Sequence, residues 1–208
     1  MTAPAGICDA LERRLRHPLP GLAAQAAMAP AGRISSAYDP NPPGANHAAV
    51  LLLLTARHEL VFIRRAADGR APSGQIAFPG GAREDHDADL CATALRETEE
   101  EIGVSRASVR LLGALSPLYI SVSNYVVHPF VGCVGEVPRF VCQPGEVDEA
   151  MALPVEGFDA ACGELETTRR GRPYRAPCYR FGAVAVWGAT AMITAEFLKV
   201  WREVGDHA

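Results

Sequence analysis

The sequence lacks an excess of basic charge. Its 208 residues carry 20 lysines and arginines against 24 aspartates and glutamates, which gives a formal net charge of -4 at pH 7. A chain without a global positive field has little attraction for the phosphates of nucleic acid, so we expect no nucleic-acid partner. If the substrate is an anion, its binding must be local, through a few arginines or a metal ion.

Long hydrophobic runs are also missing. The longest strongly apolar run, residues 48–56, is half the length of a membrane span, so we expect a buried strand there and no membrane segment. The N-terminus has no basic start followed by an apolar core, and the six cysteines form no C-x-x-C pair. A secretory leader and a structural zinc site are therefore not expected, and the cysteines favour reduced thiols in a cytoplasmic protein.

The composition is that of a globular protein, with 49% hydrophobic and 21% charged residues. The length suits one main domain with a proper core. We expect a short amphipathic helix at residues 7–16, followed by a lead-in rich in Pro, Gly and Ala that is extended. The predicted organisation is therefore an N-terminal helix and lead-in over residues 1–46 and one folded domain over residues 47–208.

Strand and helix patterns alternate along this domain without a regular βαβ rhythm. Helices are predicted at residues 89–102, 154–162 and 190–204, the last with Met192, Phe197 and Val200 on its buried side. Strands are predicted at residues 48–55, 60–65, 109–115, 125–134 and 147–153, with a short strand at 75–79 and one or two within 174–188. The mixture indicates an α+β fold, with helices packed on a mixed sheet.

The helix predicted at residues 89–102 is rich in Leu, Ala, Arg and Glu and contains no Pro or Gly. Asp89 is suited to cap its N-terminus, and Gly103 is suited to end it. Apolar spacing at i, i+4, i+7 and i+11 predicts a buried stripe. The stripe consists of Cys91, Leu95, Thr98 and Ile102.

Four glutamates occupy the end of this helix. At 100° per residue, Glu97, Glu100 and Glu101 fall on one face, whereas Glu99 points elsewhere. Like charges at this spacing repel, the helix contains no lysine, and the helix dipole disfavours anions at its C-terminal end. A solvated acidic face is one interpretation. A divalent cation bound by the carboxylates is the other, because it would compensate the repulsion.

The segment "FPGG" before the helix ends a strand with Gly80 and Gly81. Residues without a Cβ let a backbone carbonyl approach an ion or a phosphate closely. A tight turn is the alternative explanation, and it accounts for one glycine better than for two.

These residues resemble a known family, the Nudix hydrolases, whose pattern is G-x5-E-x7-R-E-U-x-E-E-x-G-U with U aliphatic. The leading segment is one residue longer here, Thr98 replaces an aliphatic residue, and Asp87 stands about where the first glutamate is expected. The residues that match the pattern are Gly81, Arg96, Glu97, Glu100, Glu101, Gly103 and Val104.

The resemblance implies a Nudix fold, a mixed β-sheet packed between helices in an α/β/α sandwich. It also implies Mg²⁺- or Mn²⁺-dependent hydrolysis of a nucleoside diphosphate linked to another group, with water attacking a phosphorus. Arg96 would hold a motif glutamate in place. The metal ligands that the resemblance implies are Gly81, through its carbonyl, and Glu97, Glu100 and Glu101; Glu100 and Glu101 are also catalytic candidates.

A further acidic residue from a later loop or strand often serves Nudix enzymes as a ligand or base. The segment "QPGEVDEAMALP" offers Glu146, Asp148 and Glu149. Positions three apart in an extended chain face opposite sides, so Glu146 and Glu149 should not both reach the metal. We expect Glu146, at the entrance of the strand, to be the catalytic residue, with Glu149 or a motif glutamate as the alternatives for the base.

The extra residue before Arg96 is shared with the coenzyme A pyrophosphatases, a branch that the segment "VFIRRAADGRAPSGQIAFPGGAREDHD" resembles. This resemblance implies hydrolysis of coenzyme A or its derivatives to 4'-phosphopantetheine and adenosine 3',5'-bisphosphate. It implies substrate binding by Arg65, Arg70 and Gln75. Another nucleoside diphosphate derivative (ADP-ribose, a nucleotide sugar or a modified dNTP) is the alternative, because several residues depart from the branch pattern. A homodimer is left open.

Overall fold

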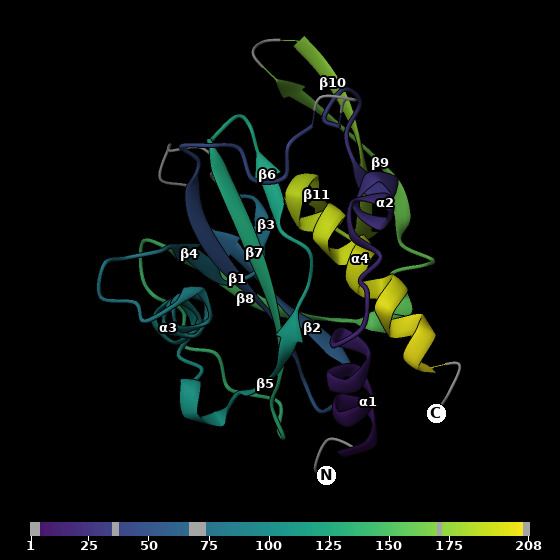
Figure 1. The fold of residues 1–208 in the computed structure, drawn as a ribbon. Helices are drawn as coiled ribbons and strands as arrows, with labels where there is room; N and C mark the ends of the chain where they lie inside the picture. Colours follow the sequence, from purple (N-terminus) through teal and green to yellow (C-terminus); the bar gives the residue numbers. More distant parts are fainter. Residues whose placement is uncertain (1–4, 35–37, 67–73, 170–171, 206–208) are drawn as a thin grey trace.

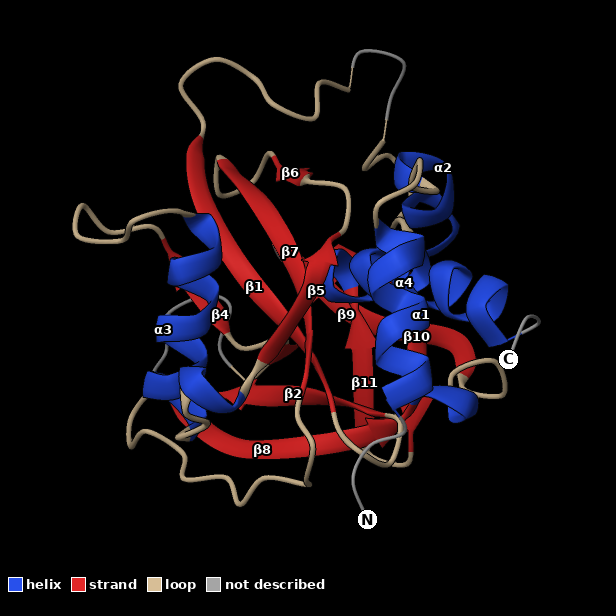
Figure 2. Ribbon diagram, turned by 60° about the horizontal axis from the view of Figure 1, so that its bottom comes forward, coloured by secondary structure: helices blue, strands red, loops and turns tan. Residues whose placement is uncertain are grey.

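A mixed β-sheet runs through the middle of the protein, with helix α3 on one face and helices α4, α1 and α2 on the other (Figures 1 and 2). The structure is a computed structural model that describes residues 5–34, 38–66, 74–169 and 172–205. The α/β/α arrangement confirms the predicted fold. Its helices are α1 (Ala5–Leu15), α2 (Gly21–Gln25), α3 (Leu90–Ile102) and α4 (Gly188–Gly205), with 3-10 turns η1 (Ala26–Met28), η2 (Arg106–Ser108) and η3 (Val155–Gly157).

The main sheet is built around β1 (Asn46–Leu54), which pairs in parallel with β7 (Tyr125–Cys133) along its whole length. On its other side β1 pairs antiparallel with the short strand β4 (Gly80–Ala82), and its end meets β2 (Glu59–Arg65) in a hairpin. The remaining strands of this sheet are β3 (Ile76–Ala77), β5 (Arg110–Ala114), β6 (Leu118–Ile120) and β8 (Val147–Pro154). The chain therefore places β4, directly before α3, against the centre of the sheet.

Two cores lie on the two faces of the sheet, because successive strand residues point to opposite sides. Leu51 and Leu53 of β1 pack in the core beneath α3. Leu52 and Leu54 pack in the larger core on the α4 side. The predicted inward residues of α4 are confirmed, since Met192, Phe197 and Val200 are all buried.

A second sheet of three antiparallel strands follows β8. It consists of β9 (Cys162–Arg169), β10 (Arg172–Phe181) and β11 (Val184–Trp187), and the β9–β10 hairpin stands at the top of Figure 1. The strands predicted within residues 174–188 correspond to β10 and β11. The helix predicted at residues 154–162 is wrong, because only the single turn η3 forms and β9 begins at Cys162.

Two further expectations need correction. The strand predicted at residues 75–79 covers only β3, and the glycine pair does not end a strand but forms most of β4. The lead-in is not extended over residues 21–28, where α2 and η1 form. The buried carboxylate of Glu196 on α4 accepts hydrogen bonds from Gly21 N at 3.0 Å and Gln25 Nε2 at 2.8 Å, which fixes α2 to α4. The boundary between residues 1–46 and 47–208 stays a prediction.

Candidate active site

Helix α3 has the ends that its sequence predicts. The side chain of Asp89 accepts a hydrogen bond from Ala92 N at 2.8 Å, and Gly103 ends the helix at φ 70°, a left-handed conformation that favours glycine. The predicted buried stripe is confirmed for two of its members, Thr98 and Ile102. Its other two members, Cys91 and Leu95, are only half-buried, and Ala94 is fully buried in their place.

The two glycines of β4 let α3 lie directly on the sheet. A Cβ added to Gly80 would overlap the backbone carbonyl of Ala49 on β1, and the residue has a φ of 148°. A Cβ added to Gly81 would overlap the carboxylate of Glu97. Close approach on both sides therefore explains the glycine pair better than a tight turn does, and it brings the backbone of Gly81 against Glu97.

Glu101 is a buried carboxylate, with 2% of its surface exposed. Its Oε2 accepts a hydrogen bond from Gly80 N at 2.8 Å, and its Oε1 lies 3.6 Å from Nη1 of Arg65. The pKa of Glu101 is raised to about 7, chiefly by burial; the charges of Glu97 and Glu146 add to the rise, whereas Gly80 N–H and Arg65 oppose it. The positive groups around this carboxylate therefore do not offset the effect of its burial.

Glu97 lies beside Glu101 and is also deprived of solvent. Burial raises the pKa of Glu97, Arg96 lowers it, and the charges of Glu100 and Glu146 raise it again. Glu97 and Glu101 thus share one electrostatic environment, and the charge of Glu146 acts on both. These three predicted site residues therefore lie within electrostatic range of one another.

Arg96 is the buried cation of the site. Its Nε and Nη2 donate to the two carboxylate oxygens of Asp87 at 2.9 and 3.0 Å, and its Nη1 lies 2.8 Å from Glu100 and 3.1 Å from Glu97. The expected pairing of Arg96 with motif glutamates is therefore present. The bidentate pair with Asp87 holds the pKa of that carboxyl well below its usual range, although burial opposes this effect.

Sequence reasoning missed this role of Asp87, which it noted only as a stand-in for the first glutamate of the family pattern. The carboxylate is buried and also accepts hydrogen bonds from Thr93 Oγ1 at 2.9 Å and from Glu84 N at 2.9 Å. The position of Asp87 near a motif acid was the available signal. Asp87 fixes Arg96, and Arg96 in turn fixes Glu97 and Glu100.

The remaining helix glutamates differ from Glu97 and Glu101. The side chain of Glu100 is 54% exposed and is held by Arg96, so in this conformation it stands at the rim of the site. Glu99 accepts from Nε of Arg106 at 2.6 Å and from Arg106 N at 3.2 Å, away from the other acids. The prediction that Glu99 points elsewhere agrees with this geometry.

Glu146 and Glu149 are separated as the sequence predicts. Glu149 lies opposite Arg64 in the β2–β8 pair, and its Oε2 lies 3.2 Å from Arg64 Nε. Glu146 precedes β8, is exposed, and influences Glu97 and Glu101. Glu149 is paired with Arg64, whereas the charge of Glu146 acts on the site glutamates, and the choice of Glu146 as the catalytic acid stays a prediction.

Two of the predicted substrate-binding residues lie in the described chain, Arg65 at the end of β2 and Gln75 beside it. Arg65 contacts Glu101, and its side chain is 37% exposed, so it reaches from the buried acid to solvent. Gln75 is half-buried, and its carbonyl accepts a hydrogen bond from Arg65 N at 3.0 Å. Arg70 lies outside the described residues.

Within the described ranges, no three histidine, cysteine, aspartate or glutamate side chains are gathered closely enough to hold a metal ion as they stand. The donor set nevertheless fits a hard divalent cation. Glu97 and Glu101 supply carboxylate oxygens, and the missing Cβ of Gly81 leaves its backbone open beside Glu97. A cation would also relieve the shared negative charge that raises the pKa of both glutamates.

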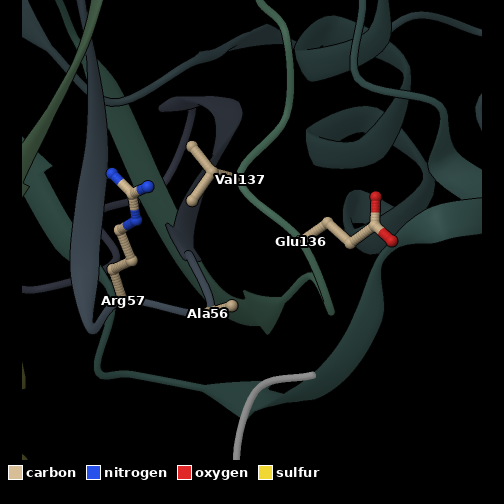
Figure 3. A pocket seen from close by; sticks show the side chains of 4 residues that line it. All are labelled: Ala56, Arg57, Glu136 and Val137. Carbon is tan, nitrogen blue, oxygen red and sulfur yellow. The ribbon is translucent and has the colours of Figure 1, made fainter. Parts of the chain in front are cut away.

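A separate surface pocket of about 360 Å³ is lined by Ala56, Arg57, Glu136 and Val137 (Figure 3). It lies at the β1–β2 turn, beyond the end of β1, whereas Gly81 pairs with Ala49 near the start of β1. The carboxylate of Glu136 points away from Arg57 in this view. The residues that line the pocket include none of the predicted site residues.

Comparison with known proteins identifies the class of this site. The model of the NUDIX domain matches residues 45–172, which is more than half of the chain. The matched range contains β1, β4, α3 and Glu146. The protein belongs to the Nudix family.

Curated relatives and solved structures agree with the family model. The chain is 37% identical over 151 residues to a protein from Photorhabdus laumondii described as an uncharacterized Nudix hydrolase, NudL, covering 71% of this chain and 80% of that one. A NudL of Pectobacterium atrosepticum is 38% identical over 136 residues, covering 64% and 70%. A Nudix hydrolase from M. smegmatis, RenU, has the same fold, with a TM-score of 0.52, 16% identity and coverage of 78% and 87%.

The family assignment confirms the predicted class of enzyme, a hydrolase that acts on diphosphate bonds. Nudix hydrolases generally act on small nucleotide substrates with the help of divalent cations. In the described part of the chain, no helix has the length and apolar character that crossing a membrane requires.

Proposed function

We propose that this protein hydrolyses the diphosphate of coenzyme A or its derivatives, with Mg²⁺ or Mn²⁺, to 4'-phosphopantetheine and adenosine 3',5'-bisphosphate. The observation that carries the proposal is the pair of solvent-deprived carboxylates, Glu97 and Glu101, against the glycine strand, with Arg65 beside them. This arrangement suits a cation together with an anionic substrate.

The proposed metal ligands are the carboxylates of Glu97, Glu100 and Glu101 and the carbonyl of Gly81. When bound, a divalent cation neutralises diphosphate oxygens and activates water for attack on phosphorus. Arg96, fixed by Asp87, keeps Glu97 and Glu100 in place. Glu100 must turn from its exposed rotamer to join the set.

The proposed reaction adds one water across the diphosphate: a P–O bond forms to the water oxygen, and the bridging P–O bond breaks. Glu146 accepts the proton of the attacking water, and Glu100 and Glu101 are the other catalytic candidates. The charge of Glu146 already acts on Glu97 and Glu101, which supports its presence at the reacting centre. Positioned proton acceptors of this kind contribute about 100-fold to 10,000-fold to rates.

Arg65, Arg70 and Gln75 are the proposed contacts to the substrate. A guanidinium grips phosphate oxygens bidentately, and Arg65 becomes available for this role when a cation takes over Glu101. The coenzyme A assignment rests on the resemblance of the segment around these residues to the coenzyme A pyrophosphatases. Another nucleoside diphosphate derivative is the second candidate for the substrate. It is favoured by the residues of that segment that differ from the coenzyme A pyrophosphatase pattern, among them Ile63 and Ala66.

A substrate panel tests the proposal. The protein is incubated with Mg²⁺ and coenzyme A, ADP-ribose, NADH or dNTPs, beside the variant Glu101→Gln and its control Glu99→Gln. We expect coenzyme A to be consumed fastest, Glu101→Gln to lose most of that turnover, and Glu99→Gln to retain it. Rapid loss of another compound with little turnover of coenzyme A would overturn the substrate assignment. Equal turnover by Glu101→Gln and the parent would overturn the site.

A cytoplasmic location and a homodimer remain predictions. All six cysteines are free thiols, as expected for a reduced compartment. The proposed partners are limited to the small nucleotide substrate, because the net charge of -4 offers no global attraction for nucleic acid.

A further inference from the structure

The turn that precedes β8 is built from Gln143, Pro144, Gly145 and Glu146. Glu146 N donates to the carbonyl of Gln143 at 3.2 Å, and Gly145 has a φ of 85°. Proline in the second position and a residue with positive φ in the third are the features of a type II turn, which favours glycine in that third position. The sequence "QPGE" therefore sets the direction of the backbone at Glu146.

This turn is fixed at both ends by backbone hydrogen bonds. Gln143 N donates to the carbonyl of Glu101 at 2.9 Å, at the end of α3, where helix carbonyls have no partner within the helix. On the other side, the carbonyl of Glu146 accepts from Ala66 N at 2.9 Å, one residue after Arg65. The turn thus connects the end of α3 to the end of β2, on either side of the pair between Glu101 and Arg65.

We propose that Gly145 is a positioning residue: its left-handed conformation aims the carboxylate of Glu146 at the glutamates of α3. The inference deepens the proposed function and rests on the role given there to Glu146. Among the described residues, no atom lies within 4 Å of a Cβ added at position 145, so the conformation of the turn accounts for the glycine. The effect of a substitution there is therefore conformational and not steric.

The test compares steady-state kinetics of Gly145→Ala, Gly145→Asn and Glu146→Gln, with Mg²⁺ and whichever panel compound the parent hydrolyses fastest. Gly135→Ala is the matched control, because Gly135 has open space around it and no positive φ. We expect Gly145→Ala to lower kcat about tenfold or more with KM within about twofold, since small misplacements of reacting groups reach 100-fold effects. Gly145→Asn should recover part of the loss, because asparagine tolerates the left-handed region.

The double variant Gly145→Ala/Glu146→Gln distinguishes positioning from general damage. If Gly145 acts through Glu146, the double variant is no slower than Glu146→Gln alone. Parental kcat in Gly145→Ala, together with a slow Glu146→Gln, would overturn the inference and leave the proposed function intact. A further loss in the double variant equal to that in the single variant would overturn it as well. Parental kcat in Glu146→Gln would instead overturn the role of Glu146 and, with it, the inference.

A second measurement tests the inference if the parent protein hydrolyses none of the panel compounds. Mn²⁺ binding is then compared by the paramagnetic signal of the free ion. Gly145→Ala should weaken binding as much as Glu146→Gln does, because the first variant turns the carboxylate of Glu146 away from the site and the second neutralises it. Binding unchanged in Gly145→Ala but weakened in Glu146→Gln would overturn the positioning role.

Discussion

The carboxylate of Glu101 is the most perturbed acid whose pKa moves into the physiological range. Its pKa rises, mainly through burial, from 4.5 to about 7. The folded protein therefore holds a proton on Glu101 between these values, whereas the unfolded chain does not. Because the native state binds more protons in this window, the free energy of unfolding falls as pH rises through it.

We predict that the Tm of the metal-free protein decreases between about pH 4.5 and pH 7, and that Glu101→Gln flattens the decrease. The loss is at most roughly 3.5 kcal/mol, at about 1.4 kcal/mol for each pKa unit between 4.5 and about 7. Thermal unfolding in EDTA measures it. Glu99→Gln is the control, because Arg106 lowers the pKa of Glu99, so that folding adds no proton to this residue. An unchanged slope in Glu101→Gln would contradict the assignment.

A second prediction concerns the contribution of the Asp87–Arg96 pair to the free energy of unfolding. Asp87→Asn removes the charge that faces a buried guanidinium, and the partners Glu97 and Glu100 compensate only in part. We expect a loss of about 2 kcal/mol or more in the free energy of unfolding, together with weaker metal binding. Chemical denaturation measures the loss, and the exposed neighbour Asp85 supplies the control Asp85→Asn. Equal stability of both variants would contradict the stabilising role of the Asp87–Arg96 pair.

Sequence reasoning at this scale identified residues whose chemistry is local to the motif. It predicted the neighbourhood of Glu97 and Glu101 because their spacing on one helix is fixed by helix geometry. It missed the clamp by Asp87 and the hydrogen bond from Gly80 N to Glu101, since both depend on how β4 and the following loop pack on α3. The direction of the Glu100 side chain could not be predicted either, because its rotamer is set by Arg96 and not by its position on the helix.

At the scale of elements, the contact between β4 and α3 makes different demands on its two glycines. Gly80→Ala places a methyl group against the backbone of Ala49, which cannot move without disturbing β1. Gly81→Ala places it against the flexible end of Glu97. We predict that Gly80→Ala lowers the free energy of unfolding by about 2 kcal/mol or more, whereas Gly81→Ala leaves stability nearly intact but weakens Mn²⁺ binding.

Circular dichroism melts and metal titrations of the two variants check this contrast. A stable Gly80→Ala, or a Gly81→Ala variant that binds Mn²⁺ like the parent, would contradict the packing described for β4.

Elements with a strong periodic pattern were predicted well, and those defined by long-range pairing were not. The patterns of buried strands or amphipathic helices are present in the sequences of β1, β2, β5, β7, β8, α3 and α4. The short strand β6 and the exposed strand β9 have no such pattern, because pairing with β7 and β10 makes them strands. Residues 158–161 were predicted as helix, but Phe158 packs into the core against Tyr179 and Phe181 of β10, and the chain turns there.

For the whole molecule, the N-terminal segment is the part whose placement the sequence did not indicate. A short amphipathic helix was predicted at residues 7–16, but not its place in the core, where Leu11 of α1 is fully buried together with Phe197 of α4. Arg110 of β5 forms ion pairs with Asp9 and Glu12 on α1. Composition rich in Pro and Gly predicts irregular chain, but it does not show whether that chain covers a core.

We predict that Leu11→Ala destabilises the entire protein by about 2 to 4 kcal/mol and that the protein still unfolds in one transition. Leu111, which is 39% exposed, supplies the control Leu111→Ala, with an expected loss of under about 1 kcal/mol. Differential scanning calorimetry distinguishes the outcomes. A separate early transition, or no change in Leu11→Ala, would show that α1 is not part of the cooperative core.

Glu97 and Glu101 are proposed to bind a divalent cation between α3 and β4. The most direct measurement is Mn²⁺ binding followed by electron paramagnetic resonance in the parent, Glu97→Gln, Glu101→Gln and Glu99→Gln, with Mg²⁺ as competitor. We predict that the parent binds Mn²⁺ and that Mg²⁺ displaces it. Affinity should be about tenfold lower or worse in Glu97→Gln and Glu101→Gln and parental in Glu99→Gln. Parental affinity in Glu101→Gln, or no binding by the parent, would contradict this proposal.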